Sequence, residues 1–442
     1  MPNKITRREF LMGCSAAIAH MSGARLTQVA FGDPANNRAP DHEIMVVVFL
    51  RGAWDALNVV PPIGGDDRGY YEANRAELQV PVNEMLQLND LFGFHPSMAP
   101  LHDLYQDQKL AVVHATGLTT NTRSHFDAMQ YMELGTPGVK TTSDGWITRH
   151  LETAPNLPTS ILIPAMSAGT LQATSLLSSS DAIAMNDPDG FSYNAHWSVR
   201  DMHRMALRRM YNGNTWLYQA GTRTLNIIDI IEAASPGSYA PSNGADYSGT
   251  GSFGNNLQVI AQMIKLDLGM RVATIDLGGW DTHENQGDGS GGYMSGMLDD
   301  LARGLAAFYQ DLDGVGEQNY TSRLSVVVMS EFGRRLRENA SGGTDHGRGS
   351  VMLALGGNVN GGQVFGNWPG LGPDQLFERT DLEVTTDYRR VLSEMLIRRG
   401  ANPNLNNVFP GYSGYSPIGV FRGTDLTPVQ DEYKVYLPQI IR

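Results

Sequence analysis

Residues 44–58 read IMVVVFLRGAWDALN, in which seven consecutive apolar residues run directly into a polar loop that contains glycine. An apolar run without alternation is typical of a strand that is buried on both faces, as the strands of parallel sheets are. Further short runs of this kind lie at residues 110–114, 160–163, 272–277, 324–329 and 351–355. Together these runs predict a mostly parallel sheet.

Helical patterns lie between the runs, at residues 98–107, 126–134, 202–233, 256–268, 297–312 and 387–398. Alternation of strands and helices favours an α/β fold, which we expect to be a three-layer sandwich with right-handed crossovers. Two glycine- and serine-rich stretches, near residues 236–255 and 286–296, are predicted to be loop insertions. Because no linker interrupts the pattern, we interpret residues 33–442 as a single domain.

The composition supports a large soluble core and excludes several classes of protein. The chain has 442 residues, of which 41% are hydrophobic, so folding needs no disulfide or metal staple. No apolar stretch reaches 18 residues, which excludes a multi-pass membrane protein, and we expect no integral membrane segment in the mature chain. The net charge is −13, and an acidic surface of this kind disfavours nucleic acid as a partner.

The N-terminus has the features of a removable export signal. Residues 6–11 read TRREFL, a paired arginine followed by Glu9, Phe10 and Leu11, and this resembles a twin-arginine signal. A modest apolar stretch follows, and residues 30–32 (AFG) form a small-residue cleavage site. We therefore expect residues 1–32 to be a signal peptide and the mature protein to be periplasmic or extracellular. The only cysteine, Cys14, lies in this segment, so the mature chain would have no thiolate chemistry.

Acidic residues and histidines follow the predicted strands, at the edge where ligands bind in open α/β sheets. Carboxylates and neutral imidazoles are the ligands that Zn²⁺ and Mn²⁺ take when cysteine is absent. A lone aspartate in such a loop is usually a turn or cap residue, but several such loops in this order indicate a metal site. The candidate ligands are Asp55, Asp281, His283, Glu331, Asp345 and His346.

Ser124 begins a predicted helix, where a serine commonly acts as an N-cap. A helix N-terminus also favours a bound anion, because its free amides and dipole carry positive charge. A serine beside a metal ion could therefore attack a phosphorus or sulfur centre. The neighbouring Arg123 could hold the ester oxygens, and His125 completes the set of candidate catalytic residues.

The order of these motifs is similar to that of the alkaline phosphatase and sulfatase superfamily. Within it, the chain most resembles a bacterial family of twin-arginine-exported proteins that is labelled as a domain of unknown function. The resemblance covers roughly residues 44 to 400, and the phrases that carry it are LRGAWDALN (50–58), RSHFD (123–127), GWI (145–147), DTH (281–283), SEFGR (330–334) and TDHGR (344–348). It implies an alkaline-phosphatase-like sandwich around one or two divalent ions.

The resemblance also implies a role for each candidate residue. Asp55 matches the acid that holds the metal on the nucleophile side, and Ser124 matches the nucleophile. Asp281 and His283 match ligands of the second metal, and His346 matches its last histidine. Glu331 stands where the superfamily usually has an aspartate. Alternatively, Asp345 and His346 together match the Asp-His-Gly ligand pair of the superfamily.

Three departures from the superfamily pattern bear on the number of ions. The residue after Glu331 is Phe332, where a histidine ligand is common. Asp281 and His283 are separated by two positions rather than four, and Gly-Ala-Trp replaces the usual paired glycine before Asp55. These departures make the nucleophile-side metal the less supported of the two.

The sequence therefore predicts an exported metal-dependent hydrolase of small anionic phosphate or sulfate esters. The histidines favour Zn²⁺ or Mn²⁺ over Ca²⁺ or Mg²⁺. The alternative is an exported binding or structural protein that keeps the fold with a degenerate metal site and works with an exported partner or as a homo-oligomer. A third hypothesis is transfer of the phosphoryl-containing group to another alcohol.

Overall fold

The computed structural model describes residues 43–155, 157, 163–193, 195–234, 237 and 239–429. The predicted signal peptide, residues 1–32, lies outside this range. Among the described residues, every helix falls short of the length and apolar character that crossing a membrane requires.

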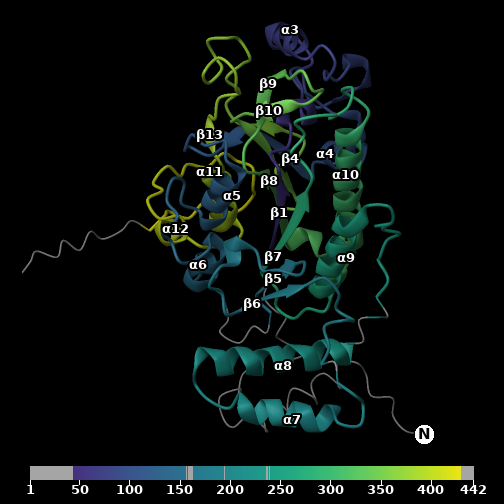
Figure 1. Cartoon of the computed structure of the whole chain (residues 1–442), viewed down its shortest axis with the longest axis vertical. Coiled ribbons are helices and arrows are strands. Elements are labelled where there is room, and N and C mark those ends of the chain that lie inside the picture. Colours follow the sequence, from purple (N-terminus) through teal and green to yellow (C-terminus); the bar gives the residue numbers. More distant parts are fainter. Residues whose placement is uncertain are drawn as a thin grey trace, which may run out of the picture.

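A nine-stranded sheet forms the centre of the molecule (Figure 1). Its strands follow the order β12-β4-β11-β8-β1-β7-β5-β6, and β13 also pairs with β4. Every pairing is parallel except those of β11 with β4 and β8. The strands are β1 (Ile44–Arg51), β4 (Leu110–Gly117), β5 (Ala165–Ala168), β6 (Ala182–Met185), β7 (Val272–Gly278), β8 (Leu324–Ser330), β11 (Ser350–Leu355), β12 (Val364–Phe365) and β13 (Thr386–Asp387).

Two short antiparallel ladders stand apart from this sheet. One pairs β9 (Arg334–Glu338) with β10 (Thr344–His346), and the other pairs β2 (Leu86–Gln87) with β3 (Gly93–Phe94).

Strand β1 shows why the sheet is buried on both faces. Successive side chains of a strand point to opposite faces, and β1 sends Val46 and Val48 into one core and Val47 and Phe49 into the other. The uninterrupted apolar run therefore supplies two cores at once, which confirms the expected α/β sandwich with a mostly parallel central sheet.

Helices cover both faces of the sheet, α4, α9 and α10 on one side and α5, α6, α11 and α12 on the other (Figure 1). In α10, Leu298, Leu301, Leu305 and Phe308 recur every three or four residues and are all buried, as a core-facing helix stripe requires. The main helices are α3 (Gly65–Asn74), α4 (Ala99–Gln106), α5 (His125–Leu134), α6 (Trp146–Thr153), α7 (Arg200–Met210), α8 (Trp216–Ala234), α9 (Gly251–Lys265), α10 (Tyr293–Leu312) and α11 (Tyr388–Arg398), with the single turns α2 (Ala56–Val59) and α12 (Leu405–Val408).

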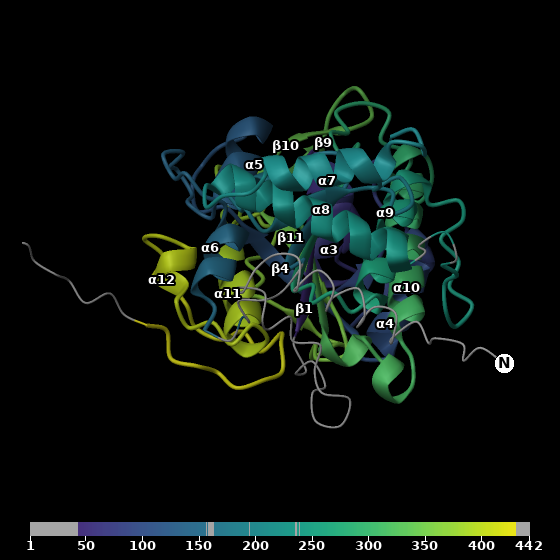
Figure 2. The same ribbon diagram turned by 90° about the horizontal axis from the view of Figure 1, so that it is seen from below.

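Some expected element boundaries differ from those observed. The run at 160–163 is followed by β5 at 165–168, and residues 160–162 lie outside the described range. The single helix expected over 202–233 is two helices, α7 and α8, because the polar segment YNGNT at 211–215 turns the chain between them (Figure 2). The helices α9 and α10 begin at Gly251 and Tyr293, inside the two stretches expected to be loops.

Candidate metal centre

The chain brings its polar motifs together at one edge of the sheet. Strands β7 and β8 both pair in parallel with β1, so the loops after their last residues lie side by side. Strand β11 runs antiparallel to β8, and its beginning therefore lies at this same edge. For this reason His346, four residues before β11, meets residues that follow strands.

Close backbone contact holds the loops after β1 and β7 together. Gly52 has a φ of +118°, and a Cβ there would lie 2.5 Å from the backbone nitrogen of Asp281. Only glycine fits this position without displacing the loop.

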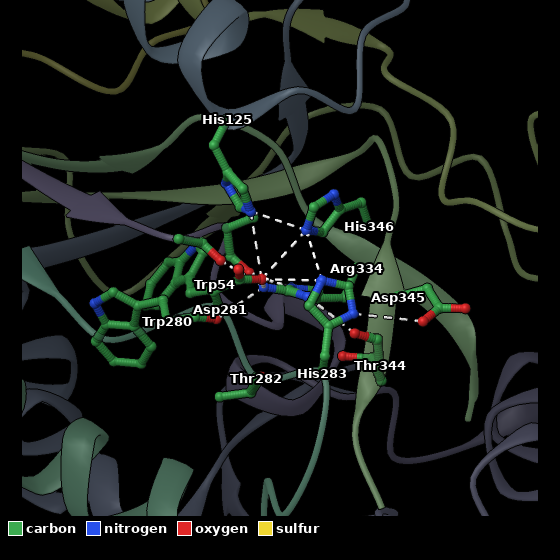
Figure 3. Close-up of polar contacts among 12 residues, drawn as sticks. Trp54, His125, Trp280, Asp281, Thr282, His283, Arg334, Thr344, Asp345 and His346 are labelled. Carbon is green, nitrogen blue, oxygen red and sulfur yellow. Dashed lines mark hydrogen bonds and ion pairs between the residues drawn. The ribbon is translucent and has the colours of Figure 1, made fainter. Parts of the chain in front are cut away.

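Three imidazoles and one carboxylate converge at this edge (Figure 3). Nε2 of His346 lies 2.8 Å from Nε2 of His125 and 2.8 Å from Nε2 of His283. Oδ1 of Asp281 lies 3.1 Å, 3.2 Å and 3.3 Å from Nε2 of His283, His346 and His125 respectively. His125, Asp281 and His346 offer ligand atoms that all lie within 4.8 Å of one another, so they could hold a metal ion.

The other ring nitrogen of each histidine faces an oxygen atom. Nδ1 of His125 lies 2.7 Å from Oε1 of Glu331, and Nδ1 of His346 lies 2.8 Å from the carbonyl oxygen of Arg123. Nδ1 of His283 lies 3.5 Å from Oδ1 of Asp345. An oxygen acceptor next to Nδ1 favours the tautomer in which Nδ1 carries the proton. In these neutral rings the lone pair therefore lies on Nε2.

Nitrogen lone pairs 2.8 Å apart repel unless a proton or a metal ion lies between them, and the spacing of the Nε2 atoms suits either. Zn²⁺ ligands lie about 2.0–2.1 Å from the ion when they are imidazole nitrogens, and a histidine ligand normally donates its second N–H to an oxygen. The donor set and the outer oxygens therefore fit a divalent metal ion.

Buried partners set the charges of these groups. Burial would raise the pKa of Asp281, but the hydrogen bond from Arg334 and the positive charge of that guanidinium outweigh it and lower the pKa to about 2. The hydrogen bond to Glu331 raises the pKa of His125, whereas burial lowers the pKa of His346. The hydrogen bond from Asn339 lowers the pKa of Asp345.

Glu331 and Asp345 lie behind the imidazoles. Glu331 is fully buried, and its carboxylate accepts from the backbone N–H of Gly52 at 2.9 Å and from the hydroxyl of Ser330 at 2.9 Å. Phe332 packs on His125 with ring centroids 5.0 Å apart. The residue after Glu331 is thus a ring that supports His125 and offers no ligand atom.

Asp55 lies in a separate, buried ion pair. Its Oδ1 accepts from Arg75 at 2.9 Å, and its Oδ2 accepts from Arg75 and, at 2.8 Å, from Gln286. Both Asp55 and Arg75 are inaccessible to solvent. The structure therefore places the other expected ligands at the metal centre: Asp281, His283 and His346 face one another, and Glu331 and Asp345 contact the histidines. Asp55 instead forms an ion pair with Arg75.

Ser124 and Arg123 connect α5 to the imidazoles. The hydroxyl of Ser124 caps α5 by accepting from the backbone N–H of Asp127 at 3.4 Å. The guanidinium of Arg123 donates to Asp381 at 2.6 Å and to Glu378 at 2.9 Å. The guanidinium of Arg123, which was expected to hold ester oxygens, is thus already paired with two carboxylates. This favours a positioning role for Arg123.

Arg334 is a central residue to which the sequence pattern assigned no role. It is buried, and its guanidinium donates to the carbonyl oxygens of Gly52 at 2.6 Å and Thr344 at 2.9 Å and to Oδ1 of Asp281 at 2.6 Å. It therefore joins the loops after β1 and β7 to β10 (Figure 3). Its place directly after Glu331-Phe332-Gly333 was the only sequence signal for it.

Residues 231–399 match the family model described as "Protein of unknown function (DUF1501)". This segment contains Asp281, His283, Glu331 and His346. No curated protein gives a significant match.

Three solved structures show a distant likeness, each with 10% sequence identity. The PsFucS1 sulfatase from Pseudoalteromonas sp. has a TM-score of 0.38 and covers 94% of this chain and 77% of its own. Ps i-CgsB, in complex with k-i-k-neocarrahexaose, has a TM-score of 0.34, with 74% and 68% covered. The lipoteichoic acid synthase LtaP from Listeria monocytogenes has a TM-score of 0.29, with 87% and 75% covered.

Proposed function

We propose that this chain is a metal-dependent hydrolase of phosphate or sulfate esters that uses one divalent ion. The observation that carries the proposal is the convergence of three Nε2 atoms, each on a ring whose Nδ1 faces an oxygen. The ligands would be His125, Asp281 and His346, with His283 beside them, and the nitrogen-rich set favours Zn²⁺ or Mn²⁺. The Arg75 guanidinium on Asp55 supports one ion rather than two.

Ser124 is the nucleophile in this proposal. A divalent ion would supply positive charge next to the ester and favour the ionised hydroxyl. Ser124 lies between two residues that contact the site: the carbonyl oxygen of Arg123 faces Nδ1 of His346, and His125 is itself a proposed ligand. These two neighbours position the backbone of Ser124 at the site. Oγ forms a bond to phosphorus or sulfur, the ester oxygen leaves and takes up a proton, and water then cleaves the serine ester. The amides at the start of α5 bind the anionic group.

We further propose that the protein is exported through its paired-arginine segment, and that it acts in the periplasm or outside the cell. Fusion of residues 1–32 to a reporter that is active only after export tests this. Replacement of Arg7 and Arg8 by lysine should retain the reporter inside the cell, and unchanged export would contradict the assignment.

The first test of the enzymatic proposal is elemental analysis of the full-length protein. We expect about one equivalent of Zn²⁺ or Mn²⁺, lost in Asp281→Ala/His346→Ala. A screen of aryl phosphates, diesters and sulfates should then find activity that Ser124→Ala abolishes while the bound metal stays. Stable, metal-free protein that ignores chelators would refute the proposal and favour a binding or structural protein. An added alcohol acceptor distinguishes transfer from hydrolysis.

A further inference from the structure

A second cluster of charge lies at the opposite edge of the sheet from the metal centre. Arg271 and Arg323 directly precede β7 and β8, at the ends where these strands begin. They line a solvent-open hollow of about 290 Å³ together with Ile44, Ile264, Met270 and Asp267. The site at the other edge uses none of these residues.

Arg271 is buried, with 6% of its surface exposed. Its backbone is fixed, because its N–H donates to Pro164 at 2.9 Å and its carbonyl accepts from Met45 at 2.8 Å. Its Nε is buried and has no hydrogen-bond partner, and among the described residues no carboxylate forms an ion pair with it. The backbone is therefore anchored while the charged end of the side chain has no protein partner.

The surroundings of Arg271 do not neutralise its charge. Arg323 adds a second positive charge, and its nearest acid is Asp267, 3.7 Å away and mostly exposed. Burial, together with the charge of Arg323, lowers the pKa of Arg271 to about 10, so Arg271 is still protonated at neutral pH. Among the described residues no acid pairs with Arg271, so its guanidinium lines the solvent-open hollow without a counter-charge from the protein.

We propose that the hollow between Arg271 and Arg323 binds a small oxyanion of the phosphate or sulfate type. Guanidinium groups present forked N–H donors that match the oxygens of such ions. The apolar walls formed by Ile44, Ile264 and Met270 exclude water from one side and strengthen the attraction. This site is independent of the proposed hydrolase function.

Unfolding in urea tests the proposal on chelator-treated, full-length protein, so that the metal centre contributes nothing. With a Kd of about 1 mM, 10 mM phosphate should raise the ratio of folded to unfolded protein about 11-fold over sodium chloride of equal ionic strength. Arg271→Met should abolish this gain and should fold at least as well as wild type without phosphate, because the buried charge is gone. Glycerol phosphate in place of phosphate distinguishes an ester group from a free ion.

Arg379→Met is the matched control, because its side chain is 72% exposed and pairs with the exposed Asp374 at 3.6 Å; it should keep the full phosphate response. If Arg271→Met does not fold, Arg323→Met replaces it and should weaken the response several-fold. The proposal is overturned if phosphate and chloride act alike on wild type, or if the arginine variants retain the phosphate effect. Failure of the hydrolase proposal would leave this result unchanged.

Discussion

Replacement of Asp55 by asparagine removes one charge from the buried pair with Arg75. The guanidinium would keep its hydrogen bonds to the carbonyl oxygens of Leu336 at 2.8 Å and Arg335 at 2.9 Å, but it would lose its carboxylate. Breaking a buried ion pair in this way costs about 3–5 kcal/mol, which is a large part of the 5–15 kcal/mol typical of a folded domain. We expect Asp55→Asn to lower the free energy of unfolding by this amount.

The assay combines urea unfolding with metal analysis of the same samples. Asp374→Asn is the control, because its side chain is 92% exposed and its loss should cost less than about 0.5 kcal/mol. Removal of both charges in Asp55→Leu/Arg75→Met should recover much of the lost stability, since no unpaired charge remains.

Metal content decides between the two roles of Asp55. If Asp55 is the ion-pair partner of Arg75 and not a metal ligand, folded Asp55→Asn should still bind its metal. A variant with wild-type stability and no metal would refute the reasoning and restore Asp55 as a ligand.

Three further predictions concern the site, acid stability and the core. Glu331→Gln should weaken metal affinity about 10- to 100-fold, because Glu331 orients His125; competition with a chelator measures this, and unchanged affinity would contradict the support role. His150 is buried, accepts from Asn402, and has its pKa lowered to about 4. The unfolded chain binds this proton near pH 6.5, so stability is lost as the pH falls from 6.5 towards 4, by about 2 kcal/mol at pH 5. Urea unfolding at pH 7 and pH 5 should show a smaller drop for His150→Gln, and an equal drop would refute it. Leu305→Ala should cost about 2–5 kcal/mol, because Leu305 is fully buried on α10; a loss below 1 kcal/mol would contradict that packing.

The sheet could be predicted because each strand carries its own signal. The run at 44–50 is apolar on both faces, and helices pack on both faces. The antiparallel direction of β11 has no such local signal, because parallel and antiparallel buried strands share one composition. Direction is decided by connections, and the short path from β8 through the β9–β10 hairpin reverses the chain.

The site was predictable in its location but only partly in its contacts. Residues after strands meet at one edge, so Asp281, His283 and His346 could be grouped from sequence. A ligand aspartate and an ion-paired aspartate look identical in sequence, so the partnership of Asp55 with Arg75 could not be read. Arg334 was missed because arginines are rarely buried, and only the three-dimensional structure places acceptors around one.

The convergence of the three imidazoles has a consequence for when the centre can form. His125 and His346 are 221 positions apart, and His125 and Glu331 are 206 apart. Contacts of such separation form late, after the slow closure of long loops, so the unfolded chain offers no preformed site. Under the proposed function, an ion in this centre would mark a molecule whose sheet is already assembled. The metal content of a preparation would then count its correctly folded molecules.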